Sequence, residues 1–390
     1  MYLKYYFDYP SQLHNILLEY VRIYFILYKK MNKILVTKTF LPPIEKYKHY
    51  IDTIWDSHQL TNQGPLLKEL EDKLKSYLTV SNLHFVSNGT IAIQLALNSL
   101  DITEGEVITT PFSYVASVSS ILWERCKPVF VDIDPDTLCI DSNKIEKAIT
   151  KNTKAILGVH VFGYPCNVEK IEMIAKEYNL KVIYDGAHAF GSKYKNRSLL
   201  DYGDITTCSF HATKLFHTIE GGCIILNNKE ISDKVELLKR FGHNLDEHYY
   251  LGINAKANEF QAAMGLCNID EIKNIIDERK KIVNLYDELL GTSVKRLVIP
   301  SNFEYNYAYY PIILKSEEET IKTIKALNDQ NIYPRRYFYP SLNTLPYLKD
   351  NQSCPISEDI SKRILCLPLY VGLEINNIQE ICKIIIKCQK

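Results

Sequence analysis

The chain has 390 residues, enough for one large domain with a smaller one and too many for a single small core. Its 46 basic and 46 acidic side chains cancel, so no excess of positive charge indicates a nucleic acid or membrane partner. Ten cysteines without a CxxC pair indicate reduced thiols in a cytoplasmic protein, and the absence of clustered Cys and His ligands predicts no metal site.

The first thirty residues are dense in tyrosine and phenylalanine. Their apolar pattern is interrupted by charged residues and a proline: Asp8, Pro10, Glu19 and Arg22. Such a run is too short and broken to span a bilayer, which takes about 20 apolar residues, and it lacks the zones of a signal peptide. We expect residues 1–30 to be an appendage of the kind that an upstream start codon adds, with the main body beginning at Met31.

From residue 62 onward, helical and strand-like patterns alternate. Residues 64–78 predict an amphipathic helix, with Pro65 in its first turn and six residues on one face: Leu66, Leu67, Leu70, Leu74, Tyr77 and Leu78. Seven short apolar runs predict buried strands: 83–86, 106–110, 127–133, 154–161, 181–185, 205–210 and 222–227. Helical stretches such as 114–125 and 168–180 lie between them. This alternation predicts an α/β fold with a mainly parallel sheet flanked by helices.

The pattern changes in the last quarter of the chain. Residues 258–290 predict one long helix, which is followed by a strand at 306–315 and helices at 317–330 and 377–390. We therefore expect a large domain over 31–280 and a smaller C-terminal α+β domain over 281–390.

Ligands of an open parallel sheet collect outside the carboxyl ends of its strands, so polar residues that follow the predicted strands are candidates for a binding site. Gly89 and Thr90, in the segment SNGT, precede a helix whose free amides could hold a phosphate; a plain helix cap is the alternative. In the segment TTPFSYVAS, Tyr114 or Phe112 could stack on a flat ring, or simply belong to the core.

Two further segments follow predicted strands. Asp185 could hold a protonated ring nitrogen, or cap the next turn; His188 could approach the same ring, or pack in the core. In SFHATK, Ser209 could bind a phosphate and Lys214 could form an imine, although a single lysine is usually a surface charge. The pattern assigns no role beyond packing to His211.

A phosphate cradle, a stacking ring, a carboxylate for a ring nitrogen and a lysine for an aldehyde are together the requirements of pyridoxal 5′-phosphate. Each feature is weak alone. Their joint occurrence predicts that this cofactor binds here.

The sequence also resembles the DegT/DnrJ/StrS sugar-nucleotide aminotransferases, which are fold-type I pyridoxal phosphate enzymes. The matching segments include SNGTIAIQLAL, VITTPFSYVAS, VIYDGAHAFG, SFHATKLFHTIEGG and LGINAKANEFQAAMG. The resemblance implies that Lys214 forms the internal aldimine and that Asp185 holds the pyridinium nitrogen. It implies five other cofactor contacts: Gly89, Thr90 and Ser209 at the phosphate, Tyr114 on the ring, and His188 near the phenolic oxygen.

In this family a second subunit completes the phosphate site with an asparagine. The corresponding segment here reads GINAKAN, which keeps Asn254 but has Lys256 where arginine is usual. The resemblance therefore implies a homodimer with shared active sites, although the change at Lys256 weakens the assignment of the exact contact.

The resemblance further implies that L-glutamate converts the cofactor to pyridoxamine 5′-phosphate, which then aminates a nucleotide-linked keto-deoxysugar. A narrower similarity favours dTDP-4-keto-6-deoxyglucose, giving dTDP-4-amino-4,6-dideoxyglucose for a surface polysaccharide such as O-antigen. Three residues of the segment YPRRYFYPSLNTLPY are candidates for the donor carboxylate or sugar diphosphate: Arg335, Arg336 and Tyr339.

Other readings remain open at this stage. A 3-keto or GDP-linked sugar would suit a nearly identical site, and a non-catalytic cofactor-binding regulator is a less favoured alternative because no basic recognition helix is evident. A related branch of the family dehydrates sugars and carries histidine in place of the lysine. Lys214 argues against that branch.

Overall fold

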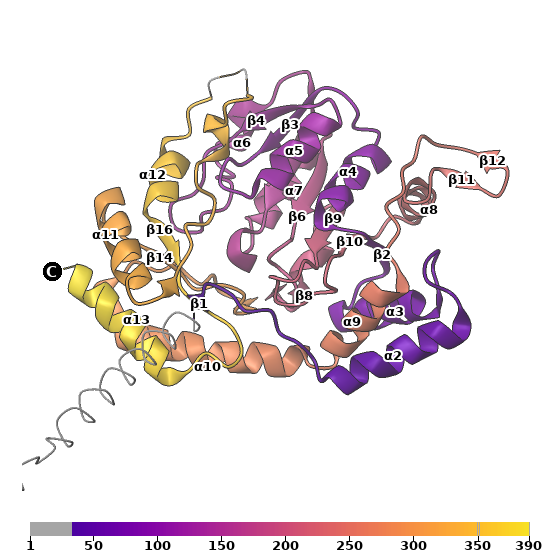
Figure 1. Ribbon diagram of the computed structural model, residues 1–390. Coiled ribbons are helices and arrows are strands. Elements are labelled where there is room, and N and C mark those ends of the chain that lie inside the picture. Colours follow the sequence, from indigo (N-terminus) through magenta and orange to yellow (C-terminus); the bar gives the residue numbers. More distant parts are fainter. Residues whose placement is uncertain (1–32, 349, 351, 390) are drawn as a thin grey trace, which may run out of the picture.

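The computed structural model of the protein describes residues 33–348, 350 and 352–389 (Figure 1). The predicted appendage, residues 1–30, lies outside these residues. Across the part of the chain that the structure describes, every helix is too short or too polar to serve as a membrane span. All ten cysteines are buried and carry free thiols.

A seven-stranded sheet forms the centre of the molecule, in the order β2-β10-β9-β6-β5-β3-β4. Its strands are β2 (Asn82–Val86), β3 (Glu106–Thr109), β4 (Lys127–Phe130), β5 (Thr153–Val159), β6 (Lys181–Asp185), β9 (Ile205–Ser209) and β10 (Gly222–Leu226). The run from β9 to β4 is parallel, whereas β10 is antiparallel to both of its neighbours. The predicted α/β fold with a mainly parallel sheet is therefore confirmed.

Helices flank this sheet (Figure 1). They are α4 (Gly89–Ser99), α5 (Val115–Trp123), α6 (Ile145–Ala148), α7 (Val168–Tyr178) and α8 (Lys229–Leu238). Two short hairpins accompany them: β7 (Lys193–Tyr194) with β8 (Arg197–Ser198), and β11 (His243–Asn244) with β12 (Glu247–His248). The apolar runs of the strands are buried from both sides, which explains why they lack alternation.

Three helices pack beside one edge of the body: α2 (Ile44–Ser57), α3 (Pro65–Leu78) and α9 (Glu259–Ile269). The leucines predicted for one face of α3 are buried. A buried carboxylate joins α3 to α9, because the Glu259 oxygens accept from the amides of Leu66 at 2.9 Å and Leu67 at 3.0 Å. This contact satisfies free amides at the start of α3.

The long helix expected over 258–290 is divided, because two residues separate the end of α9 from the start of α10 (Ile272–Leu290). α9 is buried on nearly all sides, whereas α10 buries one stripe and runs out along the C-terminal part (Figure 1). Asn268 turns its amide to the carbonyl of His217 at 2.8 Å, which fixes the end of α9 to the loop that carries Lys214.

The C-terminal part has its own buried apolar cluster, built on α10 and on α13 (Ile375–Cys388). Its other elements are β13 (Phe303–Glu304), β14 (Pro311–Ile313), α11 (Glu317–Asn328), α12 (Pro355–Arg363) and β16 (Ile364–Cys366), with β15 (Ile332–Tyr333) pairing to β1 (Ile34–Leu35). The strand expected at 306–315 is confined to β14. The predicted boundary at residue 280 falls inside α10 and remains a prediction.

Candidate active site

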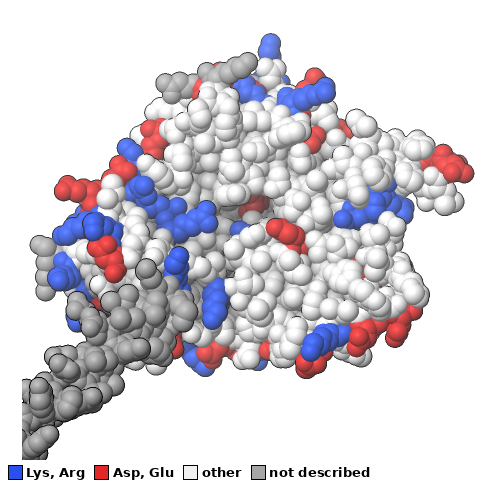
Figure 2. Space-filling view, viewed as in Figure 1, with Lys and Arg blue, Asp and Glu red and all other residues white. Residues whose placement is uncertain are grey.

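A cavity of about 270 Å³ opens at the carboxyl ends of β5, β6 and β9. The starts of α4 and α5 and a segment of the C-terminal part complete its wall, and Figure 2 shows a hollow in the middle of this face. It is lined by eight of the predicted site residues: Gly89, Thr90, Tyr114, Asp185, His188, Ser209, Lys214 and Arg335. The fold thus brings together residues that are up to 246 positions apart (335 − 89).

Three other predicted residues lie outside the cavity lining. Asn254 is exposed beside the β11–β12 hairpin and bridges to Arg240 through its backbone. Arg336 forms an ion pair with Glu317 at 3.2 Å and lies 3.7 Å from the centre of the Tyr339 ring. Their predicted contacts with a cofactor or substrate remain predictions.

Asp185 ends β6 and is buried in the floor of the cavity. Its Oδ2 atom accepts a hydrogen bond from Ser117 at 2.8 Å, and its Oδ1 atom accepts from the amide of Ala187 at 3.0 Å. Ser113 lies 2.8 Å from Ser117 and donates to it, because the single hydroxyl proton of Ser117 is already donated to Asp185. These bonds fix the orientation of the carboxylate.

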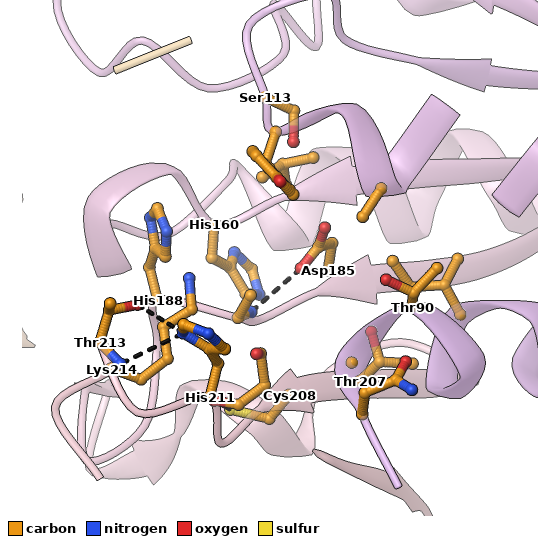
Figure 3. A pocket seen from close by; sticks show the side chains of 18 of the residues that line it. Thr90, Ser113, His160, Asp185, His188, Thr207, Cys208, His211, Thr213 and Lys214 are labelled. Carbon is orange, nitrogen blue, oxygen red and sulfur yellow. Dashed lines mark hydrogen bonds between the residues drawn. The ribbon is translucent and has the colours of Figure 1, made fainter. Parts of the chain in front are cut away.

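Lys214 projects into the cavity from a loop between β9 and β10. In Figure 3 its side chain lies near those of His188 and Asp185. The loop is held by its own bonds: the Lys214 amide donates to the His211 carbonyl at 2.8 Å, and His217 lies 2.7 Å from the Phe40 carbonyl through Nε2. These bonds stabilise the loop, and the loop in turn fixes the position of the Lys214 amine.

His211 also stabilises this turn (Figure 3). Its Nδ1 atom accepts from the Thr213 amide at 3.2 Å and lies 2.8 Å from the Thr213 hydroxyl. Its Nε2 atom faces Glu220 at 3.5 Å. The structure thus gives His211 a supporting position that its sequence context did not indicate.

Burial lowers the pKa of the Lys214 amine below its ordinary value. The negative charge of Asp185 opposes this effect, and the positive charge of Arg335 adds to it. A lowered pKa raises the fraction of neutral amine, which is the form that attacks an aldehyde. Lys214 therefore has the environment of a reactive lysine.

An anion cradle forms where α4 begins beside the end of β9. A Cβ atom on Gly89 would lie 2.8 Å from the Cβ of Ser209, so only glycine allows this approach. Asn88 caps α4 by accepting from Ile91 at 2.9 Å, while the first amides of a helix have no partner within it. Amides at a helix start together with the Ser209 hydroxyl suit a phosphate.

His188 lies against aromatic rings at the other side of the cavity. Its ring centre is 4.4 Å from that of Tyr309, and it is stacked on Phe338 at 5.7 Å. Burial and the charge of Lys214 hold the pKa of His188 well below its usual value, so the ring is neutral. Its buried Nδ1 atom has no partner among the described residues, which leaves it available to a ligand.

The predicted stacking residue, Tyr114, lies at the cavity wall just before α5. Its side chain is 62% exposed, unlike the fully buried Phe112 that was weighed against it. An exposed aromatic ring at a cavity is open to stacking, whereas Phe112 belongs to the core.

Several lining residues were not predicted. Ser113 lines the cavity and hydrogen-bonds to Ser117, four positions further along the segment that contains Tyr114, so a signal for both existed. His160 follows β5 directly, and burial lowers its pKa to about 3, which keeps it neutral. Tyr309 and Tyr337 reach the cavity from the C-terminal part, and nothing in their local sequence indicates this.

Arg335 is the basic residue that the C-terminal part presents to the cavity. Its backbone pairs with Cys366, and its guanidinium lies 5.1 Å from the centre of the Tyr337 ring. Within the residues that the structure describes, it forms no ion pair with a carboxylate, in contrast to Arg336. An unpaired guanidinium at a cavity is suited to a carboxylate or phosphate ligand.

Comparison with known proteins agrees with this geometry. Residues 44–386 match the DegT/DnrJ/EryC1/StrS aminotransferase family. The dTDP-4-amino-4,6-dideoxy-D-glucose transaminase of Shigella dysenteriae is 41% identical over 352 residues, which cover 87% of this chain and 95% of that protein. The GDP-perosamine synthase of Escherichia coli O157:H7 is 34% identical, with coverages of 87% and 94%.

Solved structures show the same fold. DesI, determined in the presence of its TDP-sugar product, has a TM-score of 0.87 and 28% identity, covering 92% of this chain and 93% of its own. The putative sugar aminotransferase Spr1654 of Streptococcus pneumoniae, in its PMP form, has a TM-score of 0.85 and 26% identity, with coverages of 92% and 98%. The chain belongs to the DegT/DnrJ/EryC1/StrS aminotransferase family, as its motifs predicted.

Proposed function

We propose that this chain is a pyridoxal 5′-phosphate-dependent aminotransferase that moves an amino group from L-glutamate to the keto group of dTDP-4-keto-6-deoxyglucose. The observation that carries the proposal is the convergence of Lys214 and Asp185 in one cavity with the anion cradle of Gly89 and Ser209. Glutamate would leave as its 2-oxo acid, and the product would be dTDP-4-amino-4,6-dideoxyglucose. We retain the expectation of a cytoplasmic enzyme supplying a surface polysaccharide.

The cavity fits the cofactor in four independent respects. The cradle would hold its phosphate, and Tyr114 would cover its ring. The carboxylate of Asp185 would hold its ring nitrogen, and the unpartnered Nδ1 of His188 would face its phenolic oxygen. When bound, the cofactor supplies an aldehyde for the lysine and a ring that accepts electrons from the reacting carbon.

The chain's own residues would perform the remaining work. Once released from the cofactor, the Nζ atom of Lys214 would accept the proton from the substrate carbon and would deliver it to the carbon of the cofactor that carries the amino group. Ser117 and the Ala187 amide would keep the Asp185 carboxylate oriented. Tyr309, Tyr337 and Phe338 would shield the reacting atoms from water.

Arg335 is our candidate for the α-carboxylate of glutamate, since it is the cavity's basic side chain other than Lys214. Arg336 and Tyr339 remain candidates for the sugar diphosphate at a position outside the cavity lining. The Shigella relative supports a dTDP-linked sugar, and the perosamine synthase supports a GDP-linked one as the second candidate.

Purified protein should show a visible absorption band of cofactor bound to Lys214, and this band should bleach when glutamate is added. We would then incubate the protein with glutamate and a panel of dTDP- and GDP-linked keto sugars and locate the new amine by NMR. An amine at C4 of the dTDP sugar is the expected product. A product aminated at C3 or formed only from a GDP sugar would contradict the substrate, and an unchanged band would contradict the activity.

We also propose a homodimer in which Asn254 enters the partner's phosphate site. Asn254 is exposed and lies outside the cavity of its own chain. The neighbouring β11–β12 hairpin extends away from the body in Figure 1. Two exposed apolar residues lie on it or directly after it: Leu245 in its turn, 84% exposed, and Leu251, three residues after β12, 92% exposed. Such apolar side chains favour burial against a second copy.

Replacing both leucines by aspartate should convert the dimer to a monomer, because the dimer interface would then bury two charges that have no partner. Sedimentation velocity measures this change. Met173→Asp, on the 70% exposed side chain of Met173 in α7, serves as the control and should leave the dimer intact. A double variant that remains dimeric would argue against the hairpin as the interface.

A further inference from the structure

Asn306 connects the C-terminal part of the chain to the loop that follows β6. It is buried, with 1% of its side chain exposed. Its Nδ2 atom donates to the carbonyls of His188 and Phe190, each at 2.8 Å, and its Oδ1 atom accepts from the Ala308 amide at 3.0 Å. One amide side chain thus ties two segments that lie 118 positions apart in sequence.

The segment around Asn306 also contacts the ring of His188. Tyr309 lies on it, with 4.4 Å between the ring centres. The backbone of Gly163 also packs closely on this contact, because a Cβ at that position would lie 2.6 Å from the His188 carbonyl and 3.0 Å from Asn306 Oδ1, so only glycine fits there. The backbone and the ring of His188 are therefore both held by residues outside its own loop.

Arg279 of α10 binds the backbone of the segment that contains Asn306. Its side chain is buried and donates to the carbonyls of Tyr307 at 2.9 Å and Ala308 at 2.5 Å. Burial lowers the pKa of Arg279 to about 10, so the group remains charged at neutral pH. Among the described residues no carboxylate pairs with it, and a buried cation with only carbonyl partners is costly.

The need for such a support follows from the ring of His188 itself. Its Nδ1 atom has no hydrogen-bond partner among the described residues, so packing and the fixed backbone determine where that atom points. In a reacting site, a displacement of about 1 Å can reduce the rate by about 10²-fold.

We propose that Asn306 is a positioning residue of the active site: its amide, supported by Arg279, fixes His188 at the cofactor-binding face of the cavity. The proposal rests on the proposed function, because it takes His188 to face the cofactor. It adds that the C-terminal part contributes to the cofactor site through the backbone of His188, in addition to lining the cavity.

The test compares Asn306→Ala with Asn343→Ala. Asn343 is also buried and donates two bonds, to Gln352 and Glu358 at 2.7 Å each. Neither of these partners lines the cavity, whereas His188, a partner of Asn306, does. Both variants lose two donated bonds, so similar losses of thermal stability are expected. We would measure the pH midpoint of the visible absorption band and the rate at which glutamate bleaches it.

Asn306→Ala should move the midpoint by about 0.5 pH units or more and slow the bleaching by about tenfold, whereas Asn343→Ala keeps both wild-type values. If Asn306→Ala does not fold, Arg279→Lys replaces it; this variant keeps the charge, loses the forked donors, and should shift both values in the same direction. Equal behaviour of the Asn306 and Asn343 variants, or wild-type values in Arg279→Lys, would overturn the inference. A wild-type protein without a band that responds to glutamate would instead overturn the proposed function.

Discussion

Lys214→Ala should lose sustained turnover of glutamate and keto sugar by about 10³-fold or more, because one side chain both binds the cofactor covalently and moves the proton. The visible band of the lysine-bound cofactor should be replaced by that of free or loosely held cofactor. The measurements are a steady-state assay and an absorption spectrum recorded before and after dialysis.

Two control variants separate chemistry from charge. Lys214→Arg keeps a cation in the cavity but cannot form the covalent bond, so it should be as inactive as the alanine variant. Lys322→Ala removes a lysine whose Nζ bonds to the Cys388 carbonyl, outside the cavity lining, and should keep wild-type turnover. Multiple turnovers by Lys214→Ala would refute the role that we assign to this lysine.

The pH dependence of cofactor capture follows from the lowered pKa of Lys214. The amine of an exposed lysine becomes neutral only as the pH rises through its ordinary pKa of 10.5. Burial lowers the pKa of Lys214, so its neutral form appears at a lower pH. Capture of added cofactor by the apo-protein should therefore accelerate as pH rises through this lowered pKa and level off above it. A rate that rises only near the pKa of a free lysine would contradict the environment described for Lys214.

The sequence predicted the fold well where a local pattern carries the information. An apolar run between turns marks a buried strand, and the leucine stripe of residues 66–78 marks the buried face of α3. It could not predict that β10 is antiparallel to its neighbours, because an apolar run has no direction. Nor could it predict the break between α9 and α10. The residues of α9 are buried on nearly all sides whereas those of α10 are buried along one stripe, and this difference depends on the neighbouring elements.

The same limit applies to the site. Asp185 and Lys214 were predicted because each belongs to a segment that follows a strand, and His160, which also follows a strand, could have been found by the same rule. The bond from Ser117 to Asp185 spans 68 positions, and the bond from Asn306 to His188 spans 118. Contacts at such separations depend on the packing of whole elements, so a local pattern does not contain them.

Asp185→Asn should reduce the rate of the glutamate half-reaction by about 10²-fold or more. The amide keeps the size of the side chain and can still accept from Ser117 through its oxygen, but it removes the negative charge that keeps a ring nitrogen protonated. Without that charge the ring is a weaker electron acceptor for the substrate carbon. The variant should also lose cofactor faster on dialysis, since an ion pair in a buried site is replaced by a neutral contact.

Asp132→Asn is the matched control for this prediction. Asp132 is also a buried carboxylate, and it accepts from the amides of Ile133, Ile356 and Ser357 at 2.9 Å each, outside the cavity lining. Its variant should unfold at a lower temperature because an amide has fewer acceptor sites for these three donors. It should nevertheless keep the half-reaction rate of the folded enzyme. If the Asp132 variant lost activity as strongly as the Asp185 variant, the effect would lie in stability, and the charge of Asp185 would have no special part in the reaction.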